Sequence, residues 1–217
     1  VEPTYVSGAD GTLRARIPRT IRRDSTFEPE EGRREIVEAM LAYVVDRAAH
    51  RLRTHEASAR SIAVHIVYVD TRLPRDRAPR NAEAREGEND SASAERRRRL
   101  PVPSDSTDEI WRHARALFRE LPRRRALVKT VGVALVDLAP RSGWQNHLYG
   151  EGEVETAASR EDRHRRLDGA MDSLRKKHGF GRVLRGASFP LTKTHPLGPD
   201  GFRLRTPSLN QGGPRSR

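Results

Sequence analysis

Cysteine is absent from the 217 residues of this sequence. Its absence excludes disulfide bonds, zinc sites with cysteine ligands and thiol catalysis. No apolar run approaches the roughly 18 residues that a membrane-spanning helix needs, and the N-terminus lacks the apolar core of a signal peptide. The cytoplasm is therefore the expected compartment, with no membrane partner. Because the sequence begins with Val1 instead of methionine, we expect it to be a piece of a longer chain.

Aromatic residues are also scarce, at 5%, and only 35% of the residues are hydrophobic. This composition predicts that part of the chain lies outside any packed core. Lysine and arginine number 42 against 30 aspartates and glutamates, which leaves a net charge of +12. That excess favours a polyanionic partner, nucleic acid before a membrane surface. Arginine suits phosphate contacts, although a high-GC genome would also enrich it.

The sequence carries no recognisable metal or catalytic motif. Two histidine pairs, His50 with His55 and His164 with His178, lack the helical spacing and third ligand of a metal site. There is no Gly-x-Ser-x-Gly elbow and no phosphate-binding P-loop. We therefore predict no metal, no cofactor and no catalytic residue in this chain.

The stretch from residue 19 to 32 reads as a basic strand, about residues 17 to 27, that turns directly into a helix. Ile21 and Phe27 share one face at the two-residue period of a strand, but Arg23 has the same parity. Alternation alone therefore leaves the faces open. Pro29 fits the first position of the helix, and the glutamates beside it favour the positive end of the helix dipole.

Further elements follow from periodicity. A helix is predicted for residues 30–53, where apolar residues recur every four positions, and a β-branched run predicts a central strand at 60–70. A long loop is predicted over residues 73–95. The residues that follow, 94–102, are predicted to form either a strand that pairs with the previous one or a simple basic loop. A helix follows at 104–121, with Ser106 and Glu109 in a capping-box pattern, and then a strand at 127–138.

The predicted order is β-α-β-β-α-β, which indicates an α+β fold with four strands in one sheet and both helices on one face. The opposite face would then be free. It would carry arginines of the opening strand, the run Arg96–Arg99 and Lys129, a plausible platform for nucleic acid.

The predicted domain organisation has five parts. They are a linker at 1–16, the sheet domain at 17–140, a tether at 141–158, a C-terminal helical segment at 159–189 that Gly179 stops as a helix, and an extended basic tail at 190–217.

Four segments resemble the C-terminal part of Y-family translesion DNA polymerases. Residues 20–27 are similar to the Ser-Ile-x-Arg-Glu-x-Thr-Phe segment that opens the little-finger domain of that family. Residues 100–108 resemble its Leu-Pro-x-Pro-Thr-Asp-Asp-Thr segment, and residues 129–135 its Arg-Leu-Leu-Gly-Val-x-Leu strand. Residues 166–179 resemble the C-terminal helix of the bacterial DinB (polymerase IV-like) branch.

The resemblance implies a domain that grips primer-template DNA beside a catalytic core. We expect Arg22 and Arg23 on the DNA-facing side, although any single arginine can equally be a solvated surface residue. The predicted DNA-binding residues are Thr20, Arg22, Arg23, His65, Arg96, Arg97, Arg98, Arg99, Arg123, Lys129 and Thr130.

A short peptide after the last strand suggests a second partner. Gln145, Leu148 and Tyr149 resemble the Gln-x-x-Leu-Phe peptide with which bacterial polymerases dock into the sliding clamp. Gln145 could make polar contacts while the two apolar residues fill a pocket. Alternatively, Leu148 and Tyr149 fold back on the domain.

The catalytic part of the family has no counterpart here. We find no strand ending in Asp-x-Asp and no Ser-x-Asp-Glu segment, so Mg²⁺ is expected only in a missing palm and the chain is not expected to be an enzyme on its own. One alternative is a split subunit completed by a separate palm chain. Another is a non-polymerase RNA-binding module, which the scarcity of aromatic residues disfavours.

Overall fold

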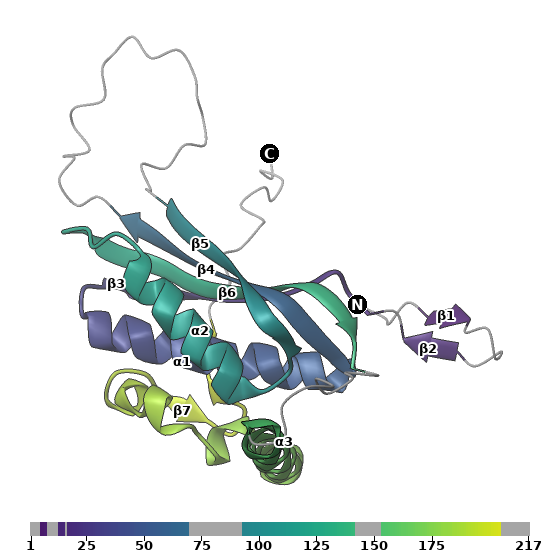
Figure 1. The fold of residues 1–217 in the computed structure, drawn as a ribbon. Helices are drawn as coiled ribbons and strands as arrows, with labels where there is room; N and C mark the ends of the chain where they lie inside the picture. Colours follow the sequence, from purple (N-terminus) through teal and green to yellow (C-terminus); the bar gives the residue numbers. More distant parts are fainter. Residues whose placement is uncertain (1–4, 8–12, 16, 70–92, 142–152, 205–217) are drawn as a thin grey trace, which may run out of the picture.

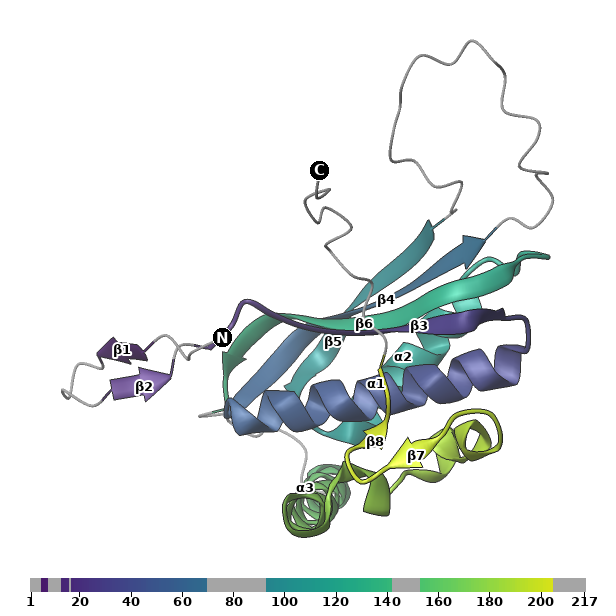
Figure 2. The same cartoon turned by 180° about the vertical axis from the view of Figure 1, so that it is seen from behind.

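The computed structural model describes residues 5–7, 13–15, 17–69, 93–141 and 153–204. Apart from a short hairpin of β1 (Tyr5–Ser7) and β2 (Leu13–Ala15), the elements form three layers. Figure 1 shows a sheet on top, two helices beneath it and a C-terminal segment beneath the helices, and Figure 2 shows the same layers from behind. The hairpin lies where the sequence suggested only a linker.

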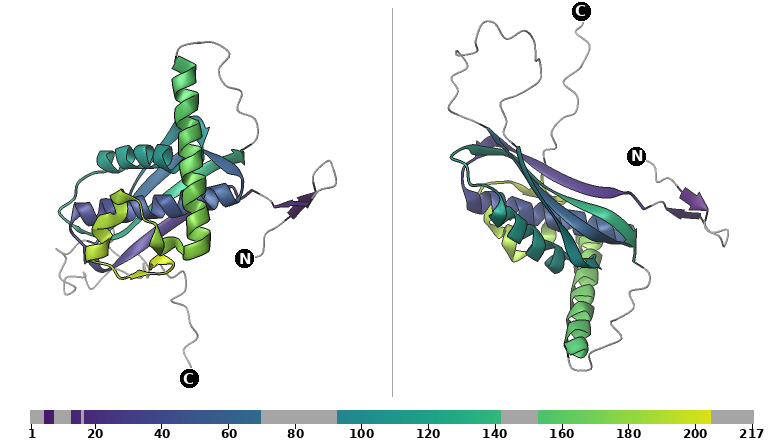
Figure 3. Two further views of the ribbon diagram at one scale, coloured as in Figure 1. Left: turned by 90° about the horizontal axis from the view of Figure 1, so that it is seen from below. Right: turned by 45° about the horizontal axis from the view of Figure 1, so that its top comes forward.

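The sheet contains four antiparallel strands in the order β3-β6-β4-β5. α1 (Arg34–Thr54) and α2 (Thr107–Glu120) both lie against one face of it (Figure 3). The predicted α+β class and β-α-β-β-α-β order are thereby confirmed, and residues 94–102 do form a strand. The strands are β3 (Thr20–Glu31), β4 (Ala57–Val69), β5 (Ser93–Ser104) and β6 (Leu127–Pro140).

Side-chain alternation along β4 determines which face meets the helices. Ile62, Val64 and Ile66 are buried against α1 and α2 because β-branched residues pack well on a pleated surface. From the edge strand, Ile21 and Phe27 join the same core, which decides the question that alternation alone left open. The residues that alternate with these, such as Arg22 of β3 and His65 of β4, point to the opposite sheet face, which we call the open face because no described helix covers it (Figure 3).

The transition from β3 to α1 differs from the prediction. Pro29 does not begin the helix: it lies within β3, after a cis Glu28–Pro29 peptide bond, and α1 begins at Arg34. Proline is tolerated here because β3 is an edge strand, where a missing N–H need not interrupt a hydrogen-bond ladder. Glu31, expected near the helix start, instead accepts hydrogen bonds from Arg33.

The capping box expected at the start of α2 is not formed. Ser106 is the N-cap residue, but its side chain makes no capping hydrogen bond. The backbone N–H of Thr107 instead donates a hydrogen bond of 3.0 Å to Oδ2 of Asp168, which lies on the third helix. A carboxylate at a helix N-terminus is favoured by the helix dipole, so a residue 61 positions away takes the role predicted for Ser106.

The C-terminal segment covers the side of α1 that faces away from the sheet. It begins with α3 (Glu153–His178), which starts six residues before the predicted helical segment at 159–189 and so occupies part of the expected tether. The helix stops before Gly179, as predicted, and φ of this glycine is 91°. Between residues 190 and 204 the chain is less extended than predicted. The remaining elements are the 3₁₀ helices η1 (Phe180–Arg182) and η2 (Gly186–Lys193) and the short strands β7 (Leu197–Gly198) and β8 (Gly201–Phe202).

Most of the surface of α1 is buried because the sheet covers one side of this helix and the C-terminal segment covers the other. Tyr43 is fully buried, and its ring packs edge-on against Phe202 and Phe180 with centroids 5.1 and 5.8 Å away. Its hydroxyl donates to the Phe202 carbonyl. A helix that is apolar on most sides must be sandwiched between layers. None of the helices in the described ranges is both long and apolar enough to cross a membrane.

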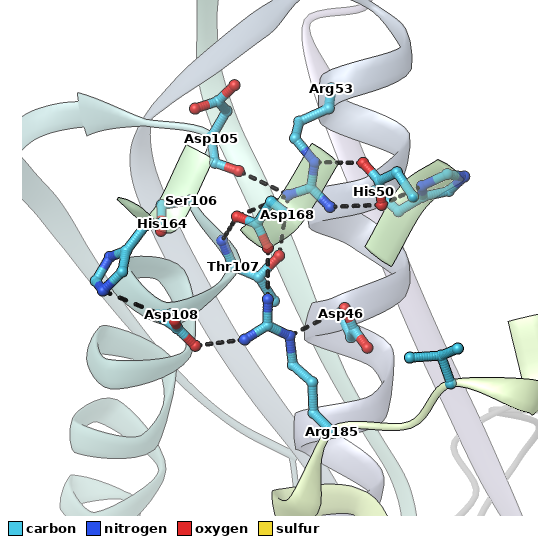
Figure 4. A network of polar contacts seen from close by, with 12 residues as sticks. Asp46, His50, Arg53, Asp105, Ser106, Thr107, Asp108, His164, Asp168 and Arg185 are labelled. Atoms are coloured by element: carbon cyan, nitrogen blue, oxygen red, sulfur yellow. Dashed lines mark hydrogen bonds and ion pairs between the residues drawn. The ribbon is translucent and has the colours of Figure 1, made fainter. Parts of the chain in front are cut away.

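A network of arginines and aspartates joins the C-terminal segment to α1 and α2 (Figure 4). Arg53 donates to Asp172 at 2.7 and 3.0 Å, and His50 contacts the same carboxylate at 2.9 Å. Burial alone would raise the pKa of Asp172, but its hydrogen bonds to His50 and Arg53 hold that pKa well below the ordinary value. Arg185 bridges Asp168 on α3 and Asp108 on α2.

The most deeply buried pair of this layer joins Arg175 of α3 to Asp46 of α1. Two hydrogen bonds of 2.9 and 2.5 Å connect the guanidinium to both carboxylate oxygens. The side chains are only 2% and 0% exposed. Arg175 also donates to the Val183 carbonyl. A buried charge is tolerated only when it is paired in this way, so the pair ties α3 to α1 in one orientation.

Candidate nucleic-acid interface

The open face is built from the alternate residues of all four strands. In its centre small side chains prevail: Ala63 of β4 is opposite Ala134 of β6, and Gly132 lies two residues before it. Larger polar side chains stand around these positions. Arg22 rises from β3 on one side, and Arg97 from β5 on the other. The result is a broad sheet surface with long cations toward both edges.

Three polar side chains meet above Gly132. The register aligns Asp24, Gly132 and His65 across β3, β6 and β4. His65 Nε2 lies 3.0 Å from Asp24 Oδ1 and 3.0 Å from Arg22 Nη2, while Arg22 Nε donates to Asp24 Oδ2 at 2.8 Å. Burial alone would raise the pKa of Asp24, but hydrogen bonds and charge from His65 and Arg22 bring it below the ordinary value.

Glycine is required at position 132 by this arrangement. A Cβ atom there would lie 2.0 Å from Asp24 Oδ1 and 2.3 Å from His65 Cε1. Only a residue without a side chain lets these two groups close over the middle strand. His65 therefore lies on the open face, as predicted, but it is buried and held by its neighbours.

The arginine run of β5 divides between the two faces. Arg97 donates to Asp137 Oδ2 at 2.7 Å, and Ser61 donates to the same oxygen at 2.8 Å. The pKa of Asp137 is lowered by the Ser61 hydrogen bond first, and also by the charges of Arg97 and Arg99. Arg97 and Arg99 therefore lie on the open face.

The expectation that the whole run lies on that face is wrong for Arg96 and Arg98. Their register partners are Val64 and Ile62, which face the helices. Arg98 reaches Glu120 of α2 at 2.5 Å. Consecutive residues of a strand point to opposite faces, so four successive arginines cannot share one.

Arg23 was also expected to face DNA beside Arg22, and it does not. It shares the parity of the buried Ile21 and Phe27. Burial lowers the pKa of Arg23, and the charges of Arg47 and Arg51 on α1 lower it further. Its side chain therefore lies toward α1 at the edge of the sheet.

The remaining predicted residues occupy varied positions. Thr20 is an exposed residue at the start of β3, and the Thr130 hydroxyl lies 3.2 Å from that of Thr26 on the open face. Lys129 sits at a bulge of β6, where the pairing with β4 shifts by one residue. Arg123 lies apart from the others, beside a small cavity of about 170 Å³ that Phe118 and Tyr68 also line.

The predicted clamp-binding residues, Gln145, Leu148 and Tyr149, fall outside the described residues. The described part of the chain contains no group of three histidine, cysteine or carboxylate side chains that could hold a metal ion. Sequence reasoning missed Asp24 and Asp137 as members of the open face. The sequence did contain a signal for Asp24: it lies two residues after Arg22, and alternate residues of a strand point to the same face.

Comparisons with known proteins give concordant matches. Residues 18–148 match the model of the impB/mucB/samB family C-terminal domain. The chain is 26% identical over 174 residues to a DNA polymerase IV of Dehalococcoides mccartyi (strain ATCC BAA-2266 / KCTC 15142 / 195), covering 80% of this chain and 37% of that protein. It is 25% identical over 157 residues to the putative UV-damage repair protein UvrX of Bacillus subtilis (strain 168), covering 72% and 32%.

Among solved structures, an insertion ternary complex of Dbh DNA polymerase matches with 19% identity and a TM-score of 0.37, over 54% of this chain and 28% of that one. The chain thus spans 37% and 32% of the lengths of the two relatives named above.

Proposed function

Because this chain belongs to the impB/mucB/samB family through its C-terminal domain, we propose that it binds primer-template DNA across the open face as the little-finger domain of a Y-family translesion DNA polymerase. One observation carries the proposal. The family-matched sheet keeps one face free of described helices, and Arg22, Arg97 and Arg99 extend from both of its edge strands. Cations at two edges can contact phosphates on both sides of a duplex groove.

The contacts would be to the backbone and would carry little sequence information. Arg22 and Arg97 are 56% and 52% exposed, so phosphates can reach both without displacing the core. Asp24 and Asp137 neutralise part of this charge, which should keep affinity moderate. Such a surface suits a domain that must let DNA slide, because phosphate contacts fix position without reading bases.

Salt-dependent binding tests this proposal. The Arg97→Gln/Arg99→Gln variant should bind primer-template duplex more weakly, and its slope of log affinity against log salt should fall by about 2, one for each lost phosphate contact. Arg119→Gln/Arg182→Gln removes the same charge from exposed positions on α2 and η1. An equal loss in this control, or no binding by the unmodified chain in dilute buffer, would contradict the proposal.

We further propose that the peptide Gln145–Tyr149 docks on the bacterial sliding clamp. It follows the last family-matched strand by a few residues, where a docking peptide can reach a separate protein without disturbing the sheet. Leu148→Ala/Tyr149→Ala should abolish capture by immobilised clamp. Unchanged capture would exclude the peptide.

The chemistry of DNA synthesis is proposed to come from a catalytic core outside the family-matched region, with Mg²⁺ held there. That core could be joined in one chain or supplied as a separate palm subunit. Primer extension by this chain mixed with an N-terminal partner, compared with each alone, distinguishes a split polymerase subunit from a domain that only binds DNA.

A further inference from the structure

Beside the edge strand β3 lies a cavity of about 590 Å³, which shares Arg22 and Asp24 with the open face. β3, α1 and the C-terminal segment form its walls. We call it the arginine cavity, because four of its lining residues are Arg22, Arg23, Arg47 and Arg203. The family model ends at residue 148, so the wall formed by residues 198–204 lies outside the matched domain.

The positive charge of this cavity is poorly neutralised. Among the described residues, no carboxylate pairs with Arg23, Arg47 or Arg203. The Nε atom of Arg23 is buried without a hydrogen-bond partner in the described structure. The cavity is also lined by Asp24 and Asp200, but Asp24 is already bound by Arg22 and His65. A buried donor on a cation without a partner is costly, unless a ligand satisfies it.

The wall opposite β3 is held firmly in place. Pro199 and Asp200 form the turn between β7 and β8. The Gly181 N–H donates to the Pro199 carbonyl at 2.8 Å, and Arg47 donates to the Asp200 carbonyl at 2.8 Å. Gly201, with φ of 96°, packs so closely on Tyr43 that a Cβ would lie 2.0 Å from its hydroxyl. The cavity is therefore preorganised, which lowers the cost of binding.

We propose that the arginine cavity binds a phosphate ester. Planar guanidinium groups form paired hydrogen bonds to phosphate oxygens, and Arg23 and Arg47 approach from adjacent walls. The volume lies within the range of small-ligand sites, so it admits the phosphate together with an attached group. Two sources share this chemistry: a backbone phosphate of nucleic acid that passes the β3 edge, and a free nucleotide or sugar phosphate.

Titration of the full chain with inorganic phosphate at constant ionic strength tests the site without DNA. Saturable shifts of the Gly198 and Gly201 amide signals in NMR spectra are expected. Arg23→Gln should weaken the affinity about tenfold, as expected for a lost charge-assisted hydrogen bond, whereas Arg119→Gln on α2 should not change it. Shifts that never saturate, or equal affinity in Arg23→Gln, would overturn the proposal.

Two additions keep this experiment decisive. Arg203 is exposed, so Arg203→Gln should fold normally and still weaken phosphate binding; an unchanged affinity would count against the site. Adding primer-template duplex to the phosphate-bound chain then identifies the source. Displacement of phosphate indicates a nucleic-acid phosphate, and simultaneous binding indicates a free phosphate ester. Failure of the open face would leave the phosphate titration unaffected, so the two proposals fail separately.

Discussion

Asp24 and His65 lie on strands that do not pair with each other, yet their side chains come within 3.0 Å above Gly132 of the strand between them. The contact crosses the middle of the open face and is closed on one side by Arg22. It links the edge strand to the central strand through side chains in addition to the backbone ladder.

Gly132→Ala should therefore destabilise the domain. Its methyl group would overlap Asp24 Oδ1 and His65 Cε1, and crowding of this kind costs about 1–3 kcal/mol. The change in the free energy of unfolding can be measured by urea denaturation. Gly169→Ala is the matched control: this glycine lies in α3 with nothing within 4 Å of the added Cβ, so its replacement should be neutral or stabilise the protein by up to about 1 kcal/mol. A neutral Gly132→Ala would contradict the close contact.

Asp172 makes stability depend on pH in the acid range. Its pKa in the folded state lies below the ordinary value because His50 and Arg53 bind the carboxylate. A lowered folded-state pKa means stability that is present above the unfolded-state pKa of about 4 and is lost as pH falls through the folded value. Asp172→Asn should therefore reduce the free energy of unfolding at pH 7 and flatten its dependence on pH below about 5.

Urea denaturation between pH 3 and 7 measures this dependence. Asp162→Asn provides the control, since Asp162 is 46% exposed and, among the residues that the structure describes, pairs with Arg165 and Arg166 of the same helix. Exposed pairs of this kind contribute about 0–1 kcal/mol. If the two variants show the same pH profile, the network around Asp172 does not stabilise the fold.

The layout of the sheet and its two helices was predictable because each element carries its own local signal. β4 is a run of β-branched residues, and α1 repeats apolar residues every four positions. The misplaced start of α1 has a different origin. Pro29 is as compatible with an edge strand as with a first helical turn, and only the pairing partner of β3 decides between them.

The faces of the arginines were predictable only in part. Strict alternation forbids a single face for Arg96–Arg99, so the division of this run between the two sheet faces was predictable from the sequence. For Arg23 the sequence offered only a partial signal, because it shares the parity of apolar residues. The cations near it come from α1 and the C-terminal segment, and their proximity could not be predicted from the sequence of the strand. Likewise, Asp168 caps α2 across 61 residues of sequence. Long-range contacts of this kind leave no periodic trace in the sequence.

Arg175→Met should destabilise the protein by about 3–5 kcal/mol, because it leaves the carboxylate of Asp46 buried without its main partner. The double variant Arg175→Met/Asp46→Leu removes both charges and should recover much of that loss. Urea denaturation of the single and double variants measures the coupling. Additive losses would show that the two side chains do not act as a pair.

Asp137→Asn should strengthen DNA binding, which is an uncommon result for a substitution at a binding surface. The carboxylate holds Arg97 at 2.7 Å and lies near Arg99, so its removal leaves both cations available to phosphates. Asparagine tolerates the left-handed backbone of this position, where φ is 57°. At low salt we expect an affinity gain of about two- to tenfold, with a slope against log salt steeper by about 1.

Fluorescence anisotropy of a labelled primer-template duplex at several salt concentrations measures both quantities. Glu109→Gln is the control, because it frees Arg112 from a comparable surface pair, but on α2 and away from the open face. If DNA lies across the open face, only Asp137→Asn strengthens binding. If both substitutions raise affinity equally, the gain reflects net charge alone, and the DNA then has no preferred side of this domain.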